Sequence, residues 1–151
     1  MLNTELFNQA VTELLHRSNS RVFVQVEPHF PDSRLVGGKY HMGSHTVYLY
    51  KKEIMEQCRM LFGSLAPLKA YIYVILAHEL GHAEDVELMD LSNLLDGPPT
   101  APEQAEIRLR IEENAWRYAE SLLFDIDPIF LRTIIDESLY SYRQAIEPHI
   151  A

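Results

Sequence analysis

The sequence predicts an α+β fold, in which a small three-stranded sheet, antiparallel or mixed, packs with several helices. Alternating apolar and polar residues, typical of strands, are confined to residues 21–50. Apolar residues three and four positions apart, typical of helices, occupy the rest of the chain on both sides of that stretch. A chain of 151 residues can bury one hydrophobic core, so residues 1–151 are expected to form a single compact domain.

The first half of the chain contains the predicted strands. Residues 4–17 carry an apolar helical stripe behind Thr4, which is expected to cap this helix. The segment "RVFVQVE" (21–27) alternates as a strand does. The segments "RLVGGKYH" (34–41) and "HTVYLY" (45–50) flank a Met-Gly-Ser turn and predict a hairpin. These three segments are expected to form the sheet.

Helices are predicted after the strands. The segment "KKEIMEQCRMLF" (51–62) has the helical period, and Gly63 is expected to end it. A second helix is expected to begin near Pro67 and to continue to about Met89, because apolar residues fill nearly every position of "YIYVILA". A helix that is apolar on all sides is expected to lie inside the molecule.

Two more helices are predicted after a loop rich in Pro and Gly, "NLLDGPPTAPE". Thr100 and Glu103 have the spacing of a capping box, which predicts a helix from there to about Phe124. Pro128, preceded by an aspartate, is expected to open the last helix, and Pro148 is expected to lie beyond its end.

The composition restricts the classes of function. Lys+Arg 13 against Asp+Glu 22 gives a net charge of -9, which argues against a nucleic-acid-binding surface. The sequence has no run of about 18 uncharged apolar residues and no recognisable signal peptide. The single cysteine, Cys58, excludes an intrachain disulfide framework. These features predict a cytoplasmic protein that binds neither nucleic acid nor a membrane.

The segment "YVILAHELGHAEDVE" (73–87) contains the residues most indicative of chemistry. His78 and His82 are four positions apart, so they project from one helix face and can bind one tetrahedral zinc ion. Glu79 lies about 100° further round the helix, where it could accept a proton from a water that the ion activates. Gly81 costs about 1 kcal/mol relative to alanine in a helix, which suggests that another backbone or the substrate comes close to it.

The surroundings of this HExxH pattern strengthen the metal hypothesis. A chance copy usually falls on a solvated helix face, whereas this one lies in an apolar helix where unpaired polar groups are costly. We therefore predict a site for one zinc ion. The HExxHxxGxxH continuation is absent, so a histidine of that type is not the third ligand. Asp85 shares the face of the two histidines and either orients one of them or is simply a carboxylate at the helix end.

The segment "IEENAWRYAESLLF" offers adjacent glutamates as the third ligand. A helical wheel surrounds Glu112 with apolar residues: Ala105, Leu109, Ala115, Trp116, Ala119 and Leu123. Glu113 falls on the charged arc, four positions before Arg117, in the order that favours a surface pair. A buried carboxylate needs a metal ion or a cation. Glu112 is therefore the predicted third ligand, and a buried ion pair with Arg108 is the alternative without metal.

These segments together resemble a known family. "AHELGH" followed by "EENAWRYAESLLF" is similar to the gluzincin metallopeptidases, especially the ImmA/IrrE-like proteins and minigluzincins, over roughly residues 45–124. The resemblance implies a zincin-like domain with His78, His82 and Glu112 as zinc ligands and Glu79 as general base. Trp116 departs from the pattern, since it stands where the family often has Asn or Asp.

The resemblance also implies an activity, the hydrolysis of peptide bonds in a peptide or protein substrate. The family binds extended substrates at the edge of a sheet, here "HTVYLY" or its hairpin partner. Some relatives cleave a repressor, so a regulatory protein is one candidate target. Many gluzincins add a Tyr or His that stabilises the oxyanion, and the candidates in this chain are Tyr140, Tyr142, His41, His45 and His149.

A second hypothesis is a latent or non-catalytic zinc-binding module with an interaction or regulatory function. The intact Glu79 speaks against lost catalysis, because a structural zinc site does not need a base. Concealed catalysis is the stronger form of this alternative: the tail "SYRQAIEPHIA" carries His149, which could lie in the cleft, although a frayed end is also expected at a terminus.

Overall fold

The computed structural model describes the backbone of residues 2–150 and the side chains of residues 3–146. Its six helices and one three-stranded mixed sheet confirm the predicted α+β class. In chain order the elements are α1 Leu2–Ser18, β1 Phe23–Glu27, β2 Gly38–His41, β3 Thr46–Tyr50, α2 Lys51–Phe62, α3 Leu68–Ala83, α4 Leu88–Asp96, α5 Ala101–Leu122 and α6 Pro128–Ile150. Among the described residues, no helix combines the length and apolar character that crossing a membrane requires.

The sheet has the order β1-β3-β2, with β3 in the middle. β1 pairs with β3 in parallel, from Phe23 opposite Thr46, and β2 pairs with β3 in antiparallel orientation, from Gly38 opposite Leu49. β3 has the most buried side chains of the three strands, which suits the central position. The prediction that "HTVYLY" could be an edge strand is therefore wrong, and its hairpin partner β2 forms an edge instead.

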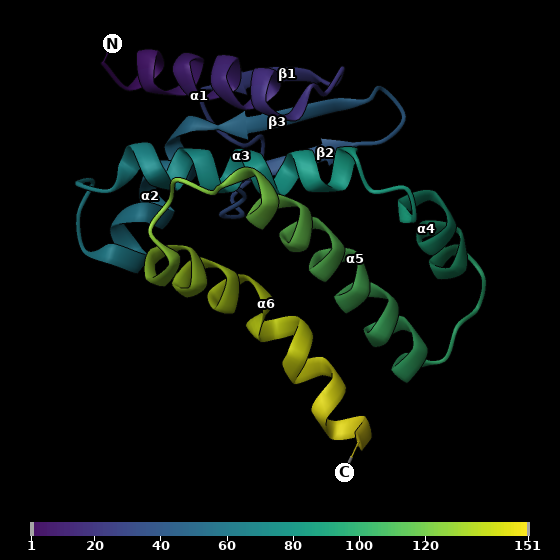
Figure 1. Ribbon diagram of the computed structural model, residues 1–151. Coiled ribbons are helices and arrows are strands. Elements are labelled where there is room, and N and C mark those ends of the chain that lie inside the picture. Colours follow the sequence, from purple (N-terminus) through teal and green to yellow (C-terminus); the bar gives the residue numbers. More distant parts are fainter. Residues whose placement is uncertain (1, 151) are drawn as a thin grey trace.

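Helix α3 occupies the centre of the molecule. Figure 1 shows α1 and the sheet on one side of α3, and α5 and α6 on the other. Because α3 has neighbours on every side, apolar residues face all round it, as "YIYVILA" predicts. The few polar side chains on this helix are thus held in fixed surroundings.

The largest error in the predicted elements concerns the end of α3. The helix ends at Ala83 rather than near Met89, because Asp85 begins a turn: its carboxylate accepts a hydrogen bond from the backbone N–H of Glu87 at 2.9 Å. A separate helix, α4, follows at Leu88–Asp96, and it occupies part of the segment predicted as loop. A local side-chain hydrogen bond thus ends the predicted helix about six residues early, and α4 lies mostly beyond its predicted end.

Other helix ends agree with the sequence in part. Gly63 ends α2 with φ 79°, and Thr100 and Glu103 form the predicted capping box. Thr4 does not cap α1, because the helical backbone already begins at Leu2. Pro148 does not end α6: it lies in the last turn, where a missing N–H removes few helical hydrogen bonds, and the helix continues to Ile150.

Candidate metal centre

The centre is built where α3 and α5 come together. A Cβ atom on Gly81 would overlap the backbone carbonyl of Ala115 on α5, so the two helices approach more closely than a larger residue would allow. This agrees with the expectation that another backbone comes near Gly81. Glu112 lies three positions before Ala115, about one turn away on the same face of α5. The close approach therefore brings Glu112 against the histidines of α3.

The carboxylate of Glu112 contacts both histidines. Its Oε1 atom lies 3.0 Å from Nε2 of His78, and its Oε2 atom lies 3.4 Å from Nε2 of His82. The two imidazole rings are neighbours, with centroids 4.7 Å apart. The histidine side chains are 12% exposed and that of Glu112 is 15% exposed. Three potential ligand atoms thus converge in a nearly buried place.

Glu79 lies on the other side of His78. Its Oε2 atom is 3.1 Å from Nδ1 of His78, the ring nitrogen that does not face Glu112. His78, Glu79 and His82 form a group in which the potential metal-binding atoms all lie within 4.8 Å of one another. β2 passes directly beside this group, since a Cβ atom on Gly38 would come within 2.9 Å of the Glu79 side chain. Glycine at this position leaves room for the glutamate.

The donor atoms fit a zinc ion in kind. Two imidazole nitrogens and a carboxylate are a common protein ligand set for zinc, whose bonds of about 2.0–2.1 Å place tetrahedral ligand atoms about 3.3 Å apart. The three side chains lie side by side, with Oε1 of Glu112 3.0 Å from Nε2 of His78 and Oε2 of Glu112 3.4 Å from Nε2 of His82. The group on α3 is therefore a candidate metal site. The roles of His78, His82 and Glu112 as its ligands stay a prediction.

The charges at the site favour a cation. Burial by itself would lower the pKa of His78, but the carboxylates of Glu79 and Glu112 outweigh this effect and raise the pKa to about 9. Burial would raise the pKa of the Glu112 carboxyl group, but hydrogen bonds with His78 and His82 lower it to about 2. Both shifts favour positive charge between the carboxylates of Glu79 and Glu112, which is the charge that a bound cation would bring.

Arg108, the alternative partner predicted for Glu112, does not pair with it in the described structure. Arg108 is exposed, and it makes no ion pair with any residue that the structure describes. Glu113 is exposed as predicted, but Arg117 donates to the side chain of Asn114 rather than pairing with Glu113. The helical wheel thus separated the two glutamates correctly, because α5 is regular and packs one face on α3.

Asp85 and Trp116 are neighbours of the histidines, and for Asp85 the structure agrees with the second of the two predicted readings, a carboxylate at the helix end. Asp85 does not orient a histidine: besides its bond to the backbone of Glu87, it accepts a hydrogen bond from Asn114 at 3.3 Å. Trp116 stacks on the ring of His78, with centroids 4.3 Å apart and planes 23° apart, and its indole N–H donates to Ser138 at 3.0 Å. Trp116 therefore fixes the plane of His78 by stacking.

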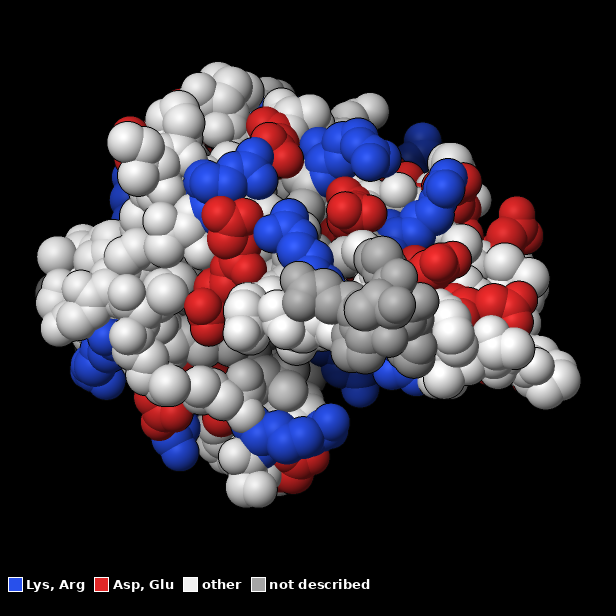
Figure 2. Space-filling model, turned by 90° about the horizontal axis from the view of Figure 1, so that it is seen from below, with Lys and Arg blue, Asp and Glu red and all other residues white. Residues whose placement is uncertain are grey.

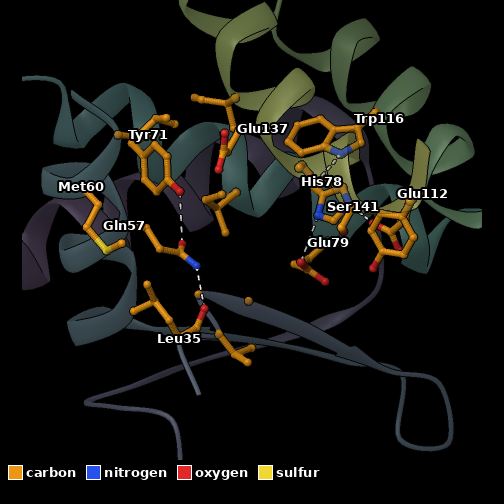
Figure 3. Close-up of a pocket in the computed structure, with 18 residues that line it drawn as sticks. Leu35, Gln57, Met60, Tyr71, His78, Glu79, Glu112, Trp116, Glu137 and Ser141 are labelled. Carbon is orange, nitrogen blue, oxygen red and sulfur yellow. Dashed lines mark hydrogen bonds and ion pairs between the residues drawn. The ribbon is translucent and has the colours of Figure 1, made fainter. Parts of the chain in front are cut away.

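Two cavities meet at the candidate metal centre. The larger, here called the main cavity, has a volume of about 600 Å³, and the smaller, the side cavity, about 370 Å³. The two cavities share five of their lining residues: Gly38, His78, Glu79, Glu112 and Tyr142. Figure 3 shows the main cavity between the strands and helices, with Glu79 and Glu112 at one end. The candidate centre is thus reached from two directions.

Among the five oxyanion candidates, Tyr142 lines both cavities. Tyr140 is exposed, His41 bonds to the hydroxyl of Ser44, and His45 bonds to the hydroxyl of Tyr40. The side chain of His149 lies outside the described residues. Position in the fold therefore distinguishes the candidates, which the sequence could not do.

The chain matches none of the protein-family models, curated proteins or solved structures with which it was compared.

Proposed function

We propose that the protein is a zinc-dependent metallopeptidase of the gluzincin type, with His78, His82 and Glu112 binding one zinc ion. The observation that supports this most directly is the carboxylate of Glu112, which contacts Nε2 of both histidines of the HExxH helix. Two cavities also open onto this group, and a purely structural ion pair would not require them. The expected partner is a peptide or protein, and a regulatory protein remains one candidate.

Glu79 would act as the general base in this proposal. When bound, zinc polarises a carbonyl group and lowers the pKa of a water molecule. Glu79 is 6% exposed, lines both cavities and is held at 3.1 Å from His78. Its carboxylate would accept the proton of the attacking water and then donate it to the leaving amine.

Tyr142 would assist from α6. Burial, together with the charge of Glu112, raises the pKa of Tyr142, so its phenol keeps the proton that it needs as a hydrogen-bond donor. It lines both cavities beside Glu79 and Glu112. In this position the hydroxyl could donate to the negative oxygen that develops on the scissile carbonyl.

The free edge of β2 would hold the substrate in extended form. The backbone N–H of Tyr50 donates to the carbonyl of Gly37 at 2.9 Å, and hydrogen-bonded pairs alternate along an antiparallel ladder. Gly38 and Tyr40 are therefore in the non-bonded pairs, and their backbone groups point away from β3. Both residues line the side cavity. A peptide strand added there would pass beside Glu79.

The alternative is a latent or non-catalytic zinc-binding module with a regulatory function. The specific observation behind it is that α6 forms a wall of the main cavity, through residues from Ile134 to Tyr142. A shift of this helix would change access to the centre. Under this hypothesis the protein binds zinc and a partner but hydrolyses no peptide.

The test combines metal analysis with a peptide library. We expect one zinc ion per chain after purification without chelators, and cleavage of library peptides. Glu79→Gln should keep the zinc and the fold but lose hydrolysis, because an amide cannot accept the proton. Glu106→Gln, the same change at an exposed position of α5, should cleave as the original protein does.

Three results would separate the hypotheses. Absence of stoichiometric zinc would overturn the whole proposal. Zinc without cleavage in the original protein would favour the latent or non-catalytic module. Cleavage by Glu79→Gln at an undiminished rate would show that Glu79 is not the base.

A further inference from the structure

The main cavity extends well beyond the candidate metal centre. Its far part lies between α2, α3, α6 and the segment before β2, and most of its walls are apolar: Leu35, Val36, Met60, Leu61, Ile75 and Ile134. A substrate held along β2 would place its backbone beside Glu79. One side chain next to the scissile bond would then enter this part of the cavity, which we call the α6 pocket.

Two polar side chains of the α6 pocket already have partners. The hydroxyl of Tyr71 donates to Oε1 of Gln57 at 3.1 Å, and Nε2 of Gln57 donates to the backbone carbonyl of Leu35 at 2.9 Å. Burial raises the pKa of Tyr71, so its hydroxyl stays neutral. These groups stiffen the wall of the pocket and bring no charge into it.

Glu137 is different, because it brings a charge into the pocket on a side chain that is also exposed to solvent. It lines the main cavity, and Figure 3 shows its carboxylate pointing into the cavity between Tyr71 and Trp116. No hydrogen bond or ion pair joins Glu137 to another residue described in the structure. The nearby cations of α6 are engaged elsewhere, since Arg132 and Arg143 both contact the neighbouring Asp136.

The face of the molecule around the end of α6 carries charges of both signs. Seen from the end of α6, basic and acidic side chains are interspersed over this face (Figure 2). The chain as a whole carries a net charge of -9. A cation that enters the pocket would therefore meet an available carboxylate in an acidic molecule.

The combination of an apolar wall and a carboxylate defines a type of side chain. Lysine and arginine have apolar stems and a charged end, so they can contact the wall and pair with a carboxylate at the same time. A leucine-like side chain would fill the apolar part but leave Glu137 without a partner. A glutamate would bring two negative charges together.

We propose that the α6 pocket selects substrates with lysine or arginine next to the scissile bond, and that Glu137 recognises the cationic end. The inference rests on the proposed peptidase function for the direction in which a peptide lies. Glu137 would determine specificity and would take no part in the hydrolysis.

The experiment uses two mixtures of extended peptides that differ at one fixed central residue, lysine or norleucine. Norleucine keeps the apolar stem of lysine and removes the charge. Binding is measured by fluorescence anisotropy with the zinc-loaded Glu79→Gln protein, and cleavage is measured with the original protein. We expect the lysine mixture to bind and to be cleaved about tenfold better, the size of discrimination that one charged contact in a partly open pocket can give.

Variants of α6 separate recognition of the lysine side chain by Glu137 from the effect of the protein's net charge. Added to Glu79→Gln, Glu137→Gln should abolish the preference for lysine in binding. As a single substitution in the original protein, Glu137→Gln should abolish the preference for lysine in cleavage. Asp136→Asn removes the same charge one position away, outside the pocket lining, and should keep the preference. Glu137→Lys should reverse it in favour of a mixture with glutamate at the fixed position.

The outcomes distinguish this inference from the proposed function. Cleavage with equal rates for lysine and norleucine, or a preference that survives Glu137→Gln, would overturn the inference and leave the peptidase intact. A preference in binding that depends on Glu137, without cleavage, would support the pocket and count against the peptidase. Binding of neither mixture would overturn the pocket.

Discussion

Glu112 and Glu113 are adjacent in α5, but their surroundings differ in every respect that matters for a metal site. Glu112 is 15% exposed and contacts His78 and His82, whereas Glu113 is exposed to solvent. Because one helix position turns the side chain by about 100°, only one of two neighbours can face α3. The chemistry of the centre is therefore sensitive to the identity of a single position.

Alanine substitutions should separate these two glutamates. Glu112→Ala should lower zinc affinity severely, because it removes a charged ligand and leaves two buried imidazoles without their carboxylate. Glu113→Ala should keep zinc affinity and change the free energy of unfolding by no more than about 0.5 kcal/mol, as is usual for exposed positions. Zinc titration and thermal melting of both variants provide the measurement. If Glu113→Ala loses zinc and Glu112→Ala keeps it, the ligand assignment is wrong.

Several residues of the candidate site could be predicted, because helical periodicity alone decides which side chains share a face. His78 and His82 share one face of α3 as their spacing predicts, and Glu112 lies on the apolar face of α5 that the helical wheel predicts, in contact with both histidines. The stacking of Trp116 on His78 and the place of Glu137 could not be predicted, since they depend on how α5 and α6 cross over α3. Periodicity within one helix contains no information about that crossing.

At the scale of elements, the contact between α3 and α5 positions the centre. The helices meet at Gly81, where no side chain separates them, and the carbonyl of Ala115 fills the space. The ligands lie on both helices, so the distance between the helices determines whether three donor atoms can surround one ion.

Gly81→Ala should therefore weaken the centre without touching a ligand. Alanine favours a helix by about 1 kcal/mol over glycine, but an added methyl group in a filled space costs about 1–3 kcal/mol and here pushes α5 away. We expect a lower melting temperature and lower zinc affinity.

Gly97→Ala is the matched control for Gly81→Ala. Gly97 follows α4 with φ -68°, and a Cβ atom there would make only an ordinary contact of 3.5 Å with the carbonyl of Leu94. The Gly97→Ala variant should keep its zinc affinity. Its free energy of unfolding should stay the same or rise by about 0.4–1 kcal/mol. If Gly81→Ala behaves as Gly97→Ala does, the close approach of α5 does not control the centre.

The predicted elements were correct where a sequence pattern decides them, and wrong where strand order or a single side-chain hydrogen bond decides them. Alternation identified three strands, and the capping box identified the start of α5. Alternation could not tell that β1 joins β3 in parallel and leaves β2 at the edge, because strand order depends on long-range packing. The early end of α3 follows from a hydrogen bond of Asp85, which competes with the helix although the apolar pattern continues.

At the scale of the whole molecule, the candidate centre joins parts of the chain that are far apart in sequence. α3 packs with α1 and the sheet on one side and with α5 and α6 on the other (Figure 1). A metal ion bound between α3 and α5 would therefore tie the second half of the chain to the central helix. Its binding free energy would add to the stability of the folded state, because the unfolded chain does not hold these ligands together.

Removal of zinc should accordingly lower the melting temperature of the protein. At a free zinc concentration about a thousandfold above Kd, binding contributes about 4 kcal/mol. For a chain of this size, that corresponds to a difference of about 10 °C in Tm. Melting with excess zinc and after complete chelation gives the measurement. His82→Ala should melt at the same temperature under both conditions, because two remaining ligands hold zinc weakly. A shift with zinc that persists in His82→Ala would mean that the stabilising ion binds elsewhere.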